Sequence, residues 1–249
     1  MKSTASTSLS SLFSHLSPLT SHLSPLTSHL SPLKMLNIKT FSVNPLQENC
    51  YVVSDETREC VIIDCGAFYD SEFRAIEAYI RDNQLKPVRH LCTHGHFDHV
   101  FGAGFIFSTY GLKPEAHAAD APWIEDVDAQ CRMMGFDLGT VPPSTPVGTL
   151  LSHDDLITFG NHTFRVLHTP GHSLGSITFY CEQEHVAFSG DTLFRMSVGR
   201  TDLPGGSWNQ LLESLATHIA TLPSDTTVYP GHGPRTVIAD EVRMNPYMK

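Results

Sequence analysis

The eight residues from Thr93 to Val100, THGHFDHV, constrain the fold of this chain more than any other stretch. Four metal-binding side chains fall within it, and they are His94, His96, Asp98 and His99. Imidazoles and carboxylates crowded this closely are typical of a metal site. Any fold of the chain must therefore place this loop where ligands from distant parts of the sequence can reach it.

Three later segments combine a β-rich run with a loop that carries a glycine and a candidate metal-binding side chain. They are HTPGHSLGS with His172, FSGDTLF with Asp191, and YPGHGPRT with His232. Binding sites gather beyond the ends of strands, and glycine lets the backbone turn sharply beside a ligand. We therefore expect these three loops to meet the first one.

The number of candidate ligands predicts a pair of divalent cations. An open catalytic site uses about three protein ligands and leaves a position for water, so seven candidates suit two cations if one carboxylate bridges them. Asp191 comes alone from a separate strand end, which makes it the expected bridge. Residues two apart in a loop can point to the same side, so His94 and His96 are expected to share one cation. Nitrogen and oxygen ligands favour zinc, with iron or manganese as alternatives.

The N-terminal segment differs from the rest in composition. Residues 14–33 repeat SHLSPLT almost perfectly, and each copy carries a proline that blocks a continuous helix. We interpret residues 1–34 as a disordered, low-complexity repeat and residues 35–249 as one hydrolase domain. Two further interpretations stay open at this stage: the segment is a weak targeting sequence, or translation starts naturally at Met35.

The composition excludes some partners. The net charge of −10 argues against nucleic acid or an anionic membrane as a partner, since both need a basic surface. The chain lacks an apolar run near the ~20 residues of a membrane span. None of the six cysteines forms a CxxC pair, so we expect buried, reduced thiols in a cytoplasmic protein. The oligomeric state stays open.

Hydrophobic patterns predict two groups of strands separated by helices. Helical spacing covers residues 70–82, 99–111, 118–134 and 207–222, with Asp70 or Ser71 expected to cap the first helix. Gly160 and Asn161 predict a tight hairpin turn between two strands. This order favours an α/β fold of two packed sheets with helices outside.

The complete motif set resembles the metallo-β-lactamase superfamily. The resemblance covers residue 35 to about residue 249. It implies an αββα sandwich of two mixed sheets with outer helices. It also implies two metal sites that share Asp191: the first uses His94, His96 and His172, and the second uses Asp98, His99 and His232.

Within the superfamily, the stretch SGDTLFRMSVGRTDLPGGS from Ser189 to Ser207 is similar to the glyoxalase II-like group. The match is to the short form, which lacks the C-terminal helical domain of the longer hydroxyacylglutathione hydrolases. β-Lactamases of the commonest type have cysteine in place of Asp191, which argues against that activity. The nucleases of the superfamily carry a large insertion between the positions of Asp191 and His232, and here only about 40 residues separate them.

The resemblance implies a hydrolase that cleaves thioesters of the S-2-hydroxyacylglutathione type. Its nucleophile would be a water shared by two cations and ionised near neutral pH. We expect Asp98 to be catalytic, to bind the second cation and to orient this water. Arg200 is a candidate for binding a substrate carboxylate, although a structural ion pair is an equal alternative, and Tyr229 is a candidate pocket residue. Asp64 is expected only to pack.

Two alternatives remain open. One is a persulfide dioxygenase with a single iron, which is similar in sequence. The other is a non-enzymatic metal-buffering protein with the repeat as an interaction tail. The expected partner is a small-molecule thioester.

Overall fold

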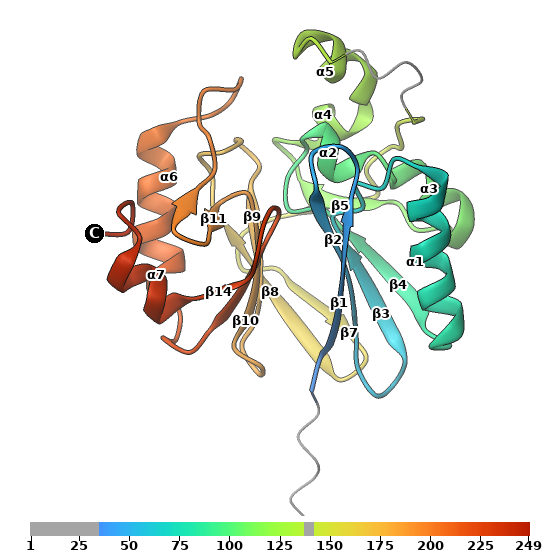
Figure 1. The fold of residues 1–249 in the computed structure, drawn as a ribbon, viewed down its shortest axis with the longest axis horizontal. Coiled ribbons are helices and arrows are strands. Elements are labelled where there is room, and N and C mark those ends of the chain that lie inside the picture. Colours follow the sequence, from blue (N-terminus) through green and yellow to red (C-terminus); the bar gives the residue numbers. More distant parts are fainter. Residues whose placement is uncertain (1–34, 137–141) are drawn as a thin grey trace, which may run out of the picture. The chain divides into compact units, whose positions relative to one another are not determined.

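The computed structural model describes residues 35–136 and 142–249. In this part of the chain two six-stranded sheets face each other, and helices cover their outer faces (Figure 1). Both sheets mix parallel and antiparallel pairs. The predicted αββα sandwich is therefore confirmed. The disorder expected for residues 1–34 lies outside the described residues.

The first sheet has the order β1-β2-β3-β4-β5-β6. Its strands are β1 (Asn37–Val43), β2 (Glu48–Ser54), β3 (Glu59–Ile63), β4 (Lys86–Leu91), β5 (Pro114–His117) and β6 (Thr149–Leu151). Its neighbouring helices are α1 (Asp70–Asp82), α2 (Phe97–Val100), α3 (Ala103–Tyr110), α4 (Ala121–Glu125) and α5 (Val127–Met133). The pairs from β1 to β3 are antiparallel, and those from β3 to β6 are parallel.

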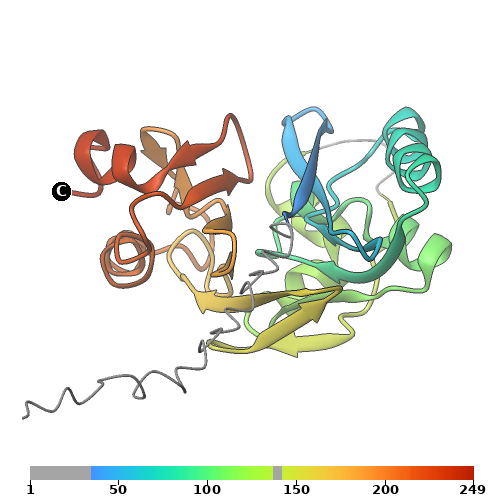
Figure 2. The same cartoon turned by 90° about the horizontal axis from the view of Figure 1, so that it is seen from below.

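The second sheet has the order β14-β13-β10-β9-β8-β7. Its strands are β7 (Leu156–Phe159), β8 (His162–His168), β9 (Ile177–Cys181), β10 (Val186–Gly190), β13 (Thr227–Pro230) and β14 (Thr236–Val237). A small ribbon of β11 (Leu193–Phe194) and β12 (Ser197–Val198) follows β10. The later helical elements are α6 (Trp208–Ser214), the π-helical turn η1 (Leu215–Ile219) and α7 (Ile238–Met244). Figure 2 shows the helices of the two halves at opposite sides.

Alternating side chains explain why the sheets are covered on both faces. In β2, Tyr51 and Val53 point into the core between the sheets, whereas Cys50 and Val52 pack toward α1 and α3. In β10, Phe188 enters the same central core and Ala187 packs toward α6 and η1. A strand buried on both faces reads as a continuous apolar run, which is how these strands look in the sequence. The loops that leave the strand ends carry the candidate ligands.

The structure confirms some predicted elements and corrects others. Helix α1 has its predicted bounds, and β7 and β8 are joined at Gly160 as the hairpin signal indicates. The cap of α1 was wrongly placed, because the helix is preceded by Tyr69, whose backbone N–H donates to Glu72 at 3.1 Å.

The three other helices predicted as continuous are interrupted. The stretch 99–111 contains the end of α2 and all of α3, the stretch 118–134 divides into α4 and α5, and the stretch 207–222 changes from α6 to η1. Strands β5, β6, β11, β12 and β14 and helix α7 were missed, because each of these strands has four residues or fewer and α7 has only seven.

All six cysteines are buried, as predicted. Across the described residues, no helix combines the length and the apolar character that crossing a bilayer requires.

We expect the stability of the protein to depend on pH through His90. Its side chain is fully buried on β4, and burial lowers its pKa from 6.5 to about 4. Between pH 4 and pH 6.5, His90 therefore holds a proton in the unfolded chain but not in the folded chain. The free energy of unfolding decreases as the pH falls from 6.5 toward 4. The variant His90→Gln should show a loss smaller by up to about 3 kcal/mol over this range. Urea unfolding of both metal-free proteins at pH 7 and pH 4.5 measures the difference, and equal pH slopes would contradict the prediction.

Candidate metal centre

Four loops at strand ends carry the predicted ligands. The loop after β4 carries His94 and His96 and leads directly into α2, which carries Asp98 and His99. The other three loops follow β8, β10 and β13, and they carry His172, Asp191 and His232. Both sheets therefore contribute to the same site.

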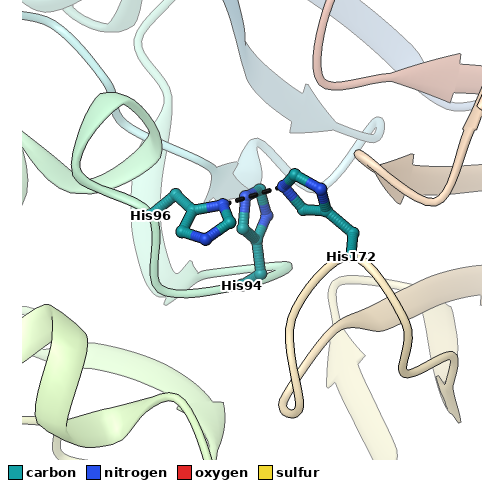
Figure 3. A group of neighbouring side chains, drawn as sticks. All are labelled: His94, His96 and His172. Carbon is teal, nitrogen blue, oxygen red and sulfur yellow. Dashed lines mark hydrogen bonds between the residues drawn. The ribbon is translucent and has the colours of Figure 1, made fainter. Parts of the chain in front are cut away.

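The first group of ligands consists of His94, His96 and His172. One nitrogen from each imidazole lies within 4.8 Å of the others, and all three side chains are buried. His96 Nδ1 lies 2.8 Å from His172 Nε2. Figure 3 shows the three rings turned toward one another, with His172 reaching across from the loop after β8. This arrangement offers three nitrogens to one cation.

The second group consists of Asp98, His99 and His232, which also lie within 4.8 Å of one another. The Oδ2 atom of Asp98 lies 3.2 Å from Nε2 of His232 and 3.8 Å from Nε2 of His99. The structure thus brings together the residues that the resemblance assigns to each site, and a third group within the same distance, Asp64, His94 and His99, overlaps both.

Asp191 lies between the two groups. Its Oδ1 is 3.4 Å from His99 Nε2, and its Oδ2 is 3.5 Å from His172 Nε2 and 3.7 Å from His232 Nε2. One carboxylate thus faces imidazoles of both groups, in the position that a bridging ligand needs.

Hydrogen bonds outside the centre fix the orientation of three imidazoles. Nδ1 of His172 donates to the carbonyl of Arg200 at 2.7 Å, and Nδ1 of His232 donates to the carbonyl of Leu46 at 3.2 Å. Nδ1 of His99 lies 3.1 Å from Oδ2 of Asp64. These oxygens accept hydrogen bonds, so each Nδ1 holds a proton and each Nε2 faces the centre. Burial lowers the pKa of His99 and His232, but Asp98 and Asp191 outweigh it and raise both, so a cation would displace a proton from these two Nε2 atoms.

Several buried polar atoms at the centre fit a bound cation. His94 Nε2, His99 Nε2 and Asp191 Oδ1 have no hydrogen-bond partner among the described residues. Leaving an atom such as His94 Nε2 buried and unpaired costs about 1–3 kcal/mol, whereas His99 Nε2 and Asp191 Oδ1 face each other as an ion pair at 3.4 Å. A divalent cation would satisfy all three, and a set of imidazoles and carboxylates is suited to zinc, iron or manganese.

The electrostatics of the centre also favour ligation. Burial lowers the pKa of His94 well below its usual range, and it lowers the pKa of His96 to about 3. Both imidazoles are therefore neutral at physiological pH, as ligands must be. Burial raises the pKa of Asp98 and Asp191, but protonated His99 and the neighbouring His232 together outweigh it and hold both pKa values below their usual range. Both carboxylates are ionised.

Asp64 corrects one expectation, because it does more than pack. Its Oδ1 accepts from the backbone N–H of Thr93 at 2.7 Å, and its Oδ2 accepts from the Thr93 hydroxyl at 2.6 Å and faces His99. Asp64 adopts a left-handed backbone with φ 50°, which places its carboxylate beneath the ligand loop. The only sequence signal was an aspartate at the end of the apolar run CVII.

Glu48 on β2 is a second residue that the sequence analysis missed. It is fully buried, and its Oε1 lies 3.9 Å from Nδ1 of His99. Burial raises the pKa of its carboxyl group well above the usual range.

A cavity of about 490 Å³ opens over the centre. Its polar base includes His96, Asp98, His172, Asp191 and His232. Its wall is apolar and is formed by Leu46, Phe97, Met133, Met134, Phe136, Leu203 and Pro204. A small molecule could therefore place a reactive group against the candidate ligands while its remaining atoms contact apolar side chains.

The two predicted substrate residues differ in position. Arg200 lines the cavity, but its Nε and Nη2 donate to Asp202 at 2.7 and 2.8 Å. Tyr229 is not among the described residues that line this cavity; its ring stacks on Phe188, and its hydroxyl accepts from Arg235 at 3.4 Å. Tyr229 on β13 packs, partly buried, against the inter-sheet core and lines a separate cavity with Asn49 and Arg235, so its role in substrate binding stays a prediction.

The fold and the site define an α/β protein with a candidate dinuclear centre at the edge of its two sheets. The family model described as "Metallo-beta-lactamase superfamily" matches residues 43–232. The chain belongs to this superfamily.

Two curated relatives cover most of the chain. "Probable metallo-hydrolase YqgX" of Bacillus subtilis is 34% identical over 83% of this chain and 94% of its own length. "Hydroxyacylglutathione hydrolase GloC" of Haemophilus influenzae is 32% identical over 86% of this chain and 98% of its own length.

Two solved structures are also similar. The BLEG-1 B3 metallo-β-lactamase has a TM-score of 0.77 and 38% identity, covering 86% of this chain and 99% of that one. TTHA1623 in a di-iron-bound form has a TM-score of 0.73 and 37% identity, covering 84% of this chain and 99% of that one.

The variant Asp64→Asn tests how His99 is oriented. Asparagine tolerates the left-handed backbone, but its amide would donate to His99 Nδ1 and move the ring proton to Nε2. We expect the Asp98–His99–His232 group to bind zinc about 10–100-fold more weakly. Zinc titration against a chromophoric chelator measures this, with the exposed Asp82→Asn as control. Unchanged affinity in Asp64→Asn would contradict the role assigned to Asp64.

Proposed function

We propose that this protein is a metal-dependent hydrolase that cleaves thioesters of the S-2-hydroxyacylglutathione type. The observation that carries the proposal is the convergence of two ligand groups, joined by Asp191, at the base of one cavity. The similarity to the hydroxyacylglutathione hydrolase GloC supports the substrate class. The small-molecule thioester partner and the cytoplasmic location belong to the same proposal.

The residues around the cavity favour attack by water. None of the described residues that line it is a serine or a cysteine, so the cavity wall offers neither of these two nucleophiles. When bound, two divalent cations would lower the pKa of a shared water toward about 7 and polarise the carbonyl of the substrate. A thiolate leaves readily, because the pKa of a thiol is near ~8.5.

Asp98 would orient the water and accept its proton. Its carboxylate is ionised, it lines the cavity, and it is held by His232 at 3.2 Å. The neutral imidazoles of His94 and His96 would hold the first cation, and Asp191 would stay ionised between the two groups. We propose zinc as the native metal, and the di-iron form of TTHA1623 makes iron the first alternative.

Arg200 remains a candidate for the carboxylate of the substrate. Its guanidinium lies at the cavity but is shared with Asp202, and both side chains are exposed. A substrate carboxylate would therefore have to replace an exposed ion pair worth at most about 1 kcal/mol.

β-Lactam hydrolysis is a second candidate, because the chain is 38% identical to the BLEG-1 metallo-β-lactamase. A persulfide dioxygenase is a third, and the two distinct ligand groups favour the hydrolase over a single-iron enzyme. Turnover of S-lactoylglutathione, a chromogenic cephalosporin and a glutathione persulfide distinguishes the three, with oxygen uptake recorded for the last.

The variants His96→Ala and Asp98→Asn test the proposed function. His96→Ala should lose one bound metal per chain and the hydrolysis of S-lactoylglutathione, because the first group loses a ligand. Asp98→Asn should lower kcat about 10²–10⁴-fold, because an amide cannot accept the proton from water. Metal analysis and steady-state kinetics measure both effects.

The exposed His185, which is paired with Asp225, provides the matched control His185→Ala. A wild-type protein that binds two metals but hydrolyses no thioester would refute the proposal. Survival of the rate in His96→Ala would refute the assignment of the site.

A further inference from the structure

Asp120 lies immediately before α4 and is fully buried, yet it does not belong to either ligand group. Its Oδ2 accepts from the backbone N–H of Gly95 at 2.9 Å and from the hydroxyl of Ser173 at 2.6 Å. Its Oδ1 accepts from the backbone N–H of Gly175 at 2.7 Å. One carboxylate thus joins the loop after β4 to the loop after β8.

These contacts lie directly beside the ligands of the first group. Gly95 stands between His94 and His96, and Ser173 follows His172. The two loops come from different sheets, and one backbone hydrogen bond, from the N–H of Ile177 to the carbonyl of Thr93 at 2.8 Å, joins their ends. It lies outside the stretches that carry His96 and His172, which Asp120 links. The distance between these stretches decides whether His96 and His172 can bind the same cation, and their facing nitrogens are 2.8 Å apart.

The two glycines fit this arrangement. A Cβ on Gly95 would lie 2.7 Å from the carbonyl oxygen of Asp120, and a Cβ on Gly175 would lie 2.5 Å from its Cγ. Both loops therefore approach Asp120 as closely as a backbone can, and a side chain at either position would push them away.

Helix α5 supports the same loop from its other side. The amide of Gln130, which is buried, accepts from the N–H of Phe97 at 2.7 Å and donates to the carbonyl of Gly95 at 2.9 Å. The backbone on both sides of His96 is therefore held by the segment that contains α4 and α5.

We propose that Asp120 is a positioning residue that sets the geometry of the three-histidine group by tying its two loops together. The inference rests on the metal centre of the proposed function. It goes further by assigning to Asp120 a role that acts through the backbone, without contact with a ligating imidazole. Loss of Asp120 should weaken the first group and leave Asp98, His99 and His232 able to bind.

The variant Asp120→Asn removes one oxygen at almost constant volume. Whichever way its amide turns, the NH₂ group faces a backbone N–H of one of the two loops, because Gly95 and Gly175 both donate. The matched control is Asp126→Asn on the same segment. Asp126 caps α5 through the N–H of Ala129, and asparagine caps equally well.

A His232→Ala background isolates the first group, because it removes a ligand of the second group only. In this background, zinc titration of the metal-free protein against a chromophoric chelator should give an affinity about 10–100-fold lower for Asp120→Asn than for Asp126→Asn. In a His96→Ala background, which isolates the second group, Asp120→Asn should leave zinc affinity unchanged.

Thermal unfolding of the same metal-free proteins separates positioning from a merely structural role. A lower midpoint for Asp120→Asn with unchanged zinc affinity in the His232→Ala background would overturn the proposal. If Asp120→Asn does not fold, Ser173→Ala removes one of the three bonds, and it should weaken the first group several-fold; unchanged affinity would again overturn the inference. A wild-type protein that binds only one zinc would refute the dinuclear part of the proposed function. The comparison of Asp120→Asn with Asp126→Asn would still measure the zinc affinity of the three-histidine group.

Discussion

The structure depends on one constraint, which is that five imidazoles and two carboxylates from four separate loops must converge at one place. Most of these side chains are buried, and they come from loops on two different sheets. Burying so many polar groups is costly unless each has a partner. The partners are one another, a surrounding set of carbonyl and carboxylate oxygens, and, as we infer, two cations. The packed sandwich provides the fixed frame that such a cluster needs.

The frame is rigid because the strands are buried on both faces. Val53 and Val61 pair in neighbouring strands and face the central core, while Cys50 and Ile62 pack under the helices. The apolar layers fix where each strand ends, and the ligands leave from those ends. Positioning by the loops alone would be less exact, because loops lack this packing.

Around the centre, protein oxygens decide which nitrogen of each histidine is available. Backbone carbonyls of Arg200 and Leu46 and the carboxylate of Asp64 each hold an Nδ1. Asp120 adds a different kind of support, because it holds backbone instead of rings. The imidazoles are thereby oriented before any cation binds, which is the condition under which a metal site is both tight and selective.

The sequence by itself determined the residue types of the site, the position of the ligand loops after strands, and the class of fold. These features follow from the local spacing of residue types along the chain. It did not determine where each helix ends. The turn after α2, for example, ends at Gly102, because the N–H of Gly102 donates to the carbonyl of the distant Cys65 at 2.8 Å. Only the tertiary structure placed Asp64 and Glu48 against His99 and Tyr229 against the inter-sheet core. Those positions depend on contacts between residues far apart in the chain, and no local pattern records which distant strand a side chain will face.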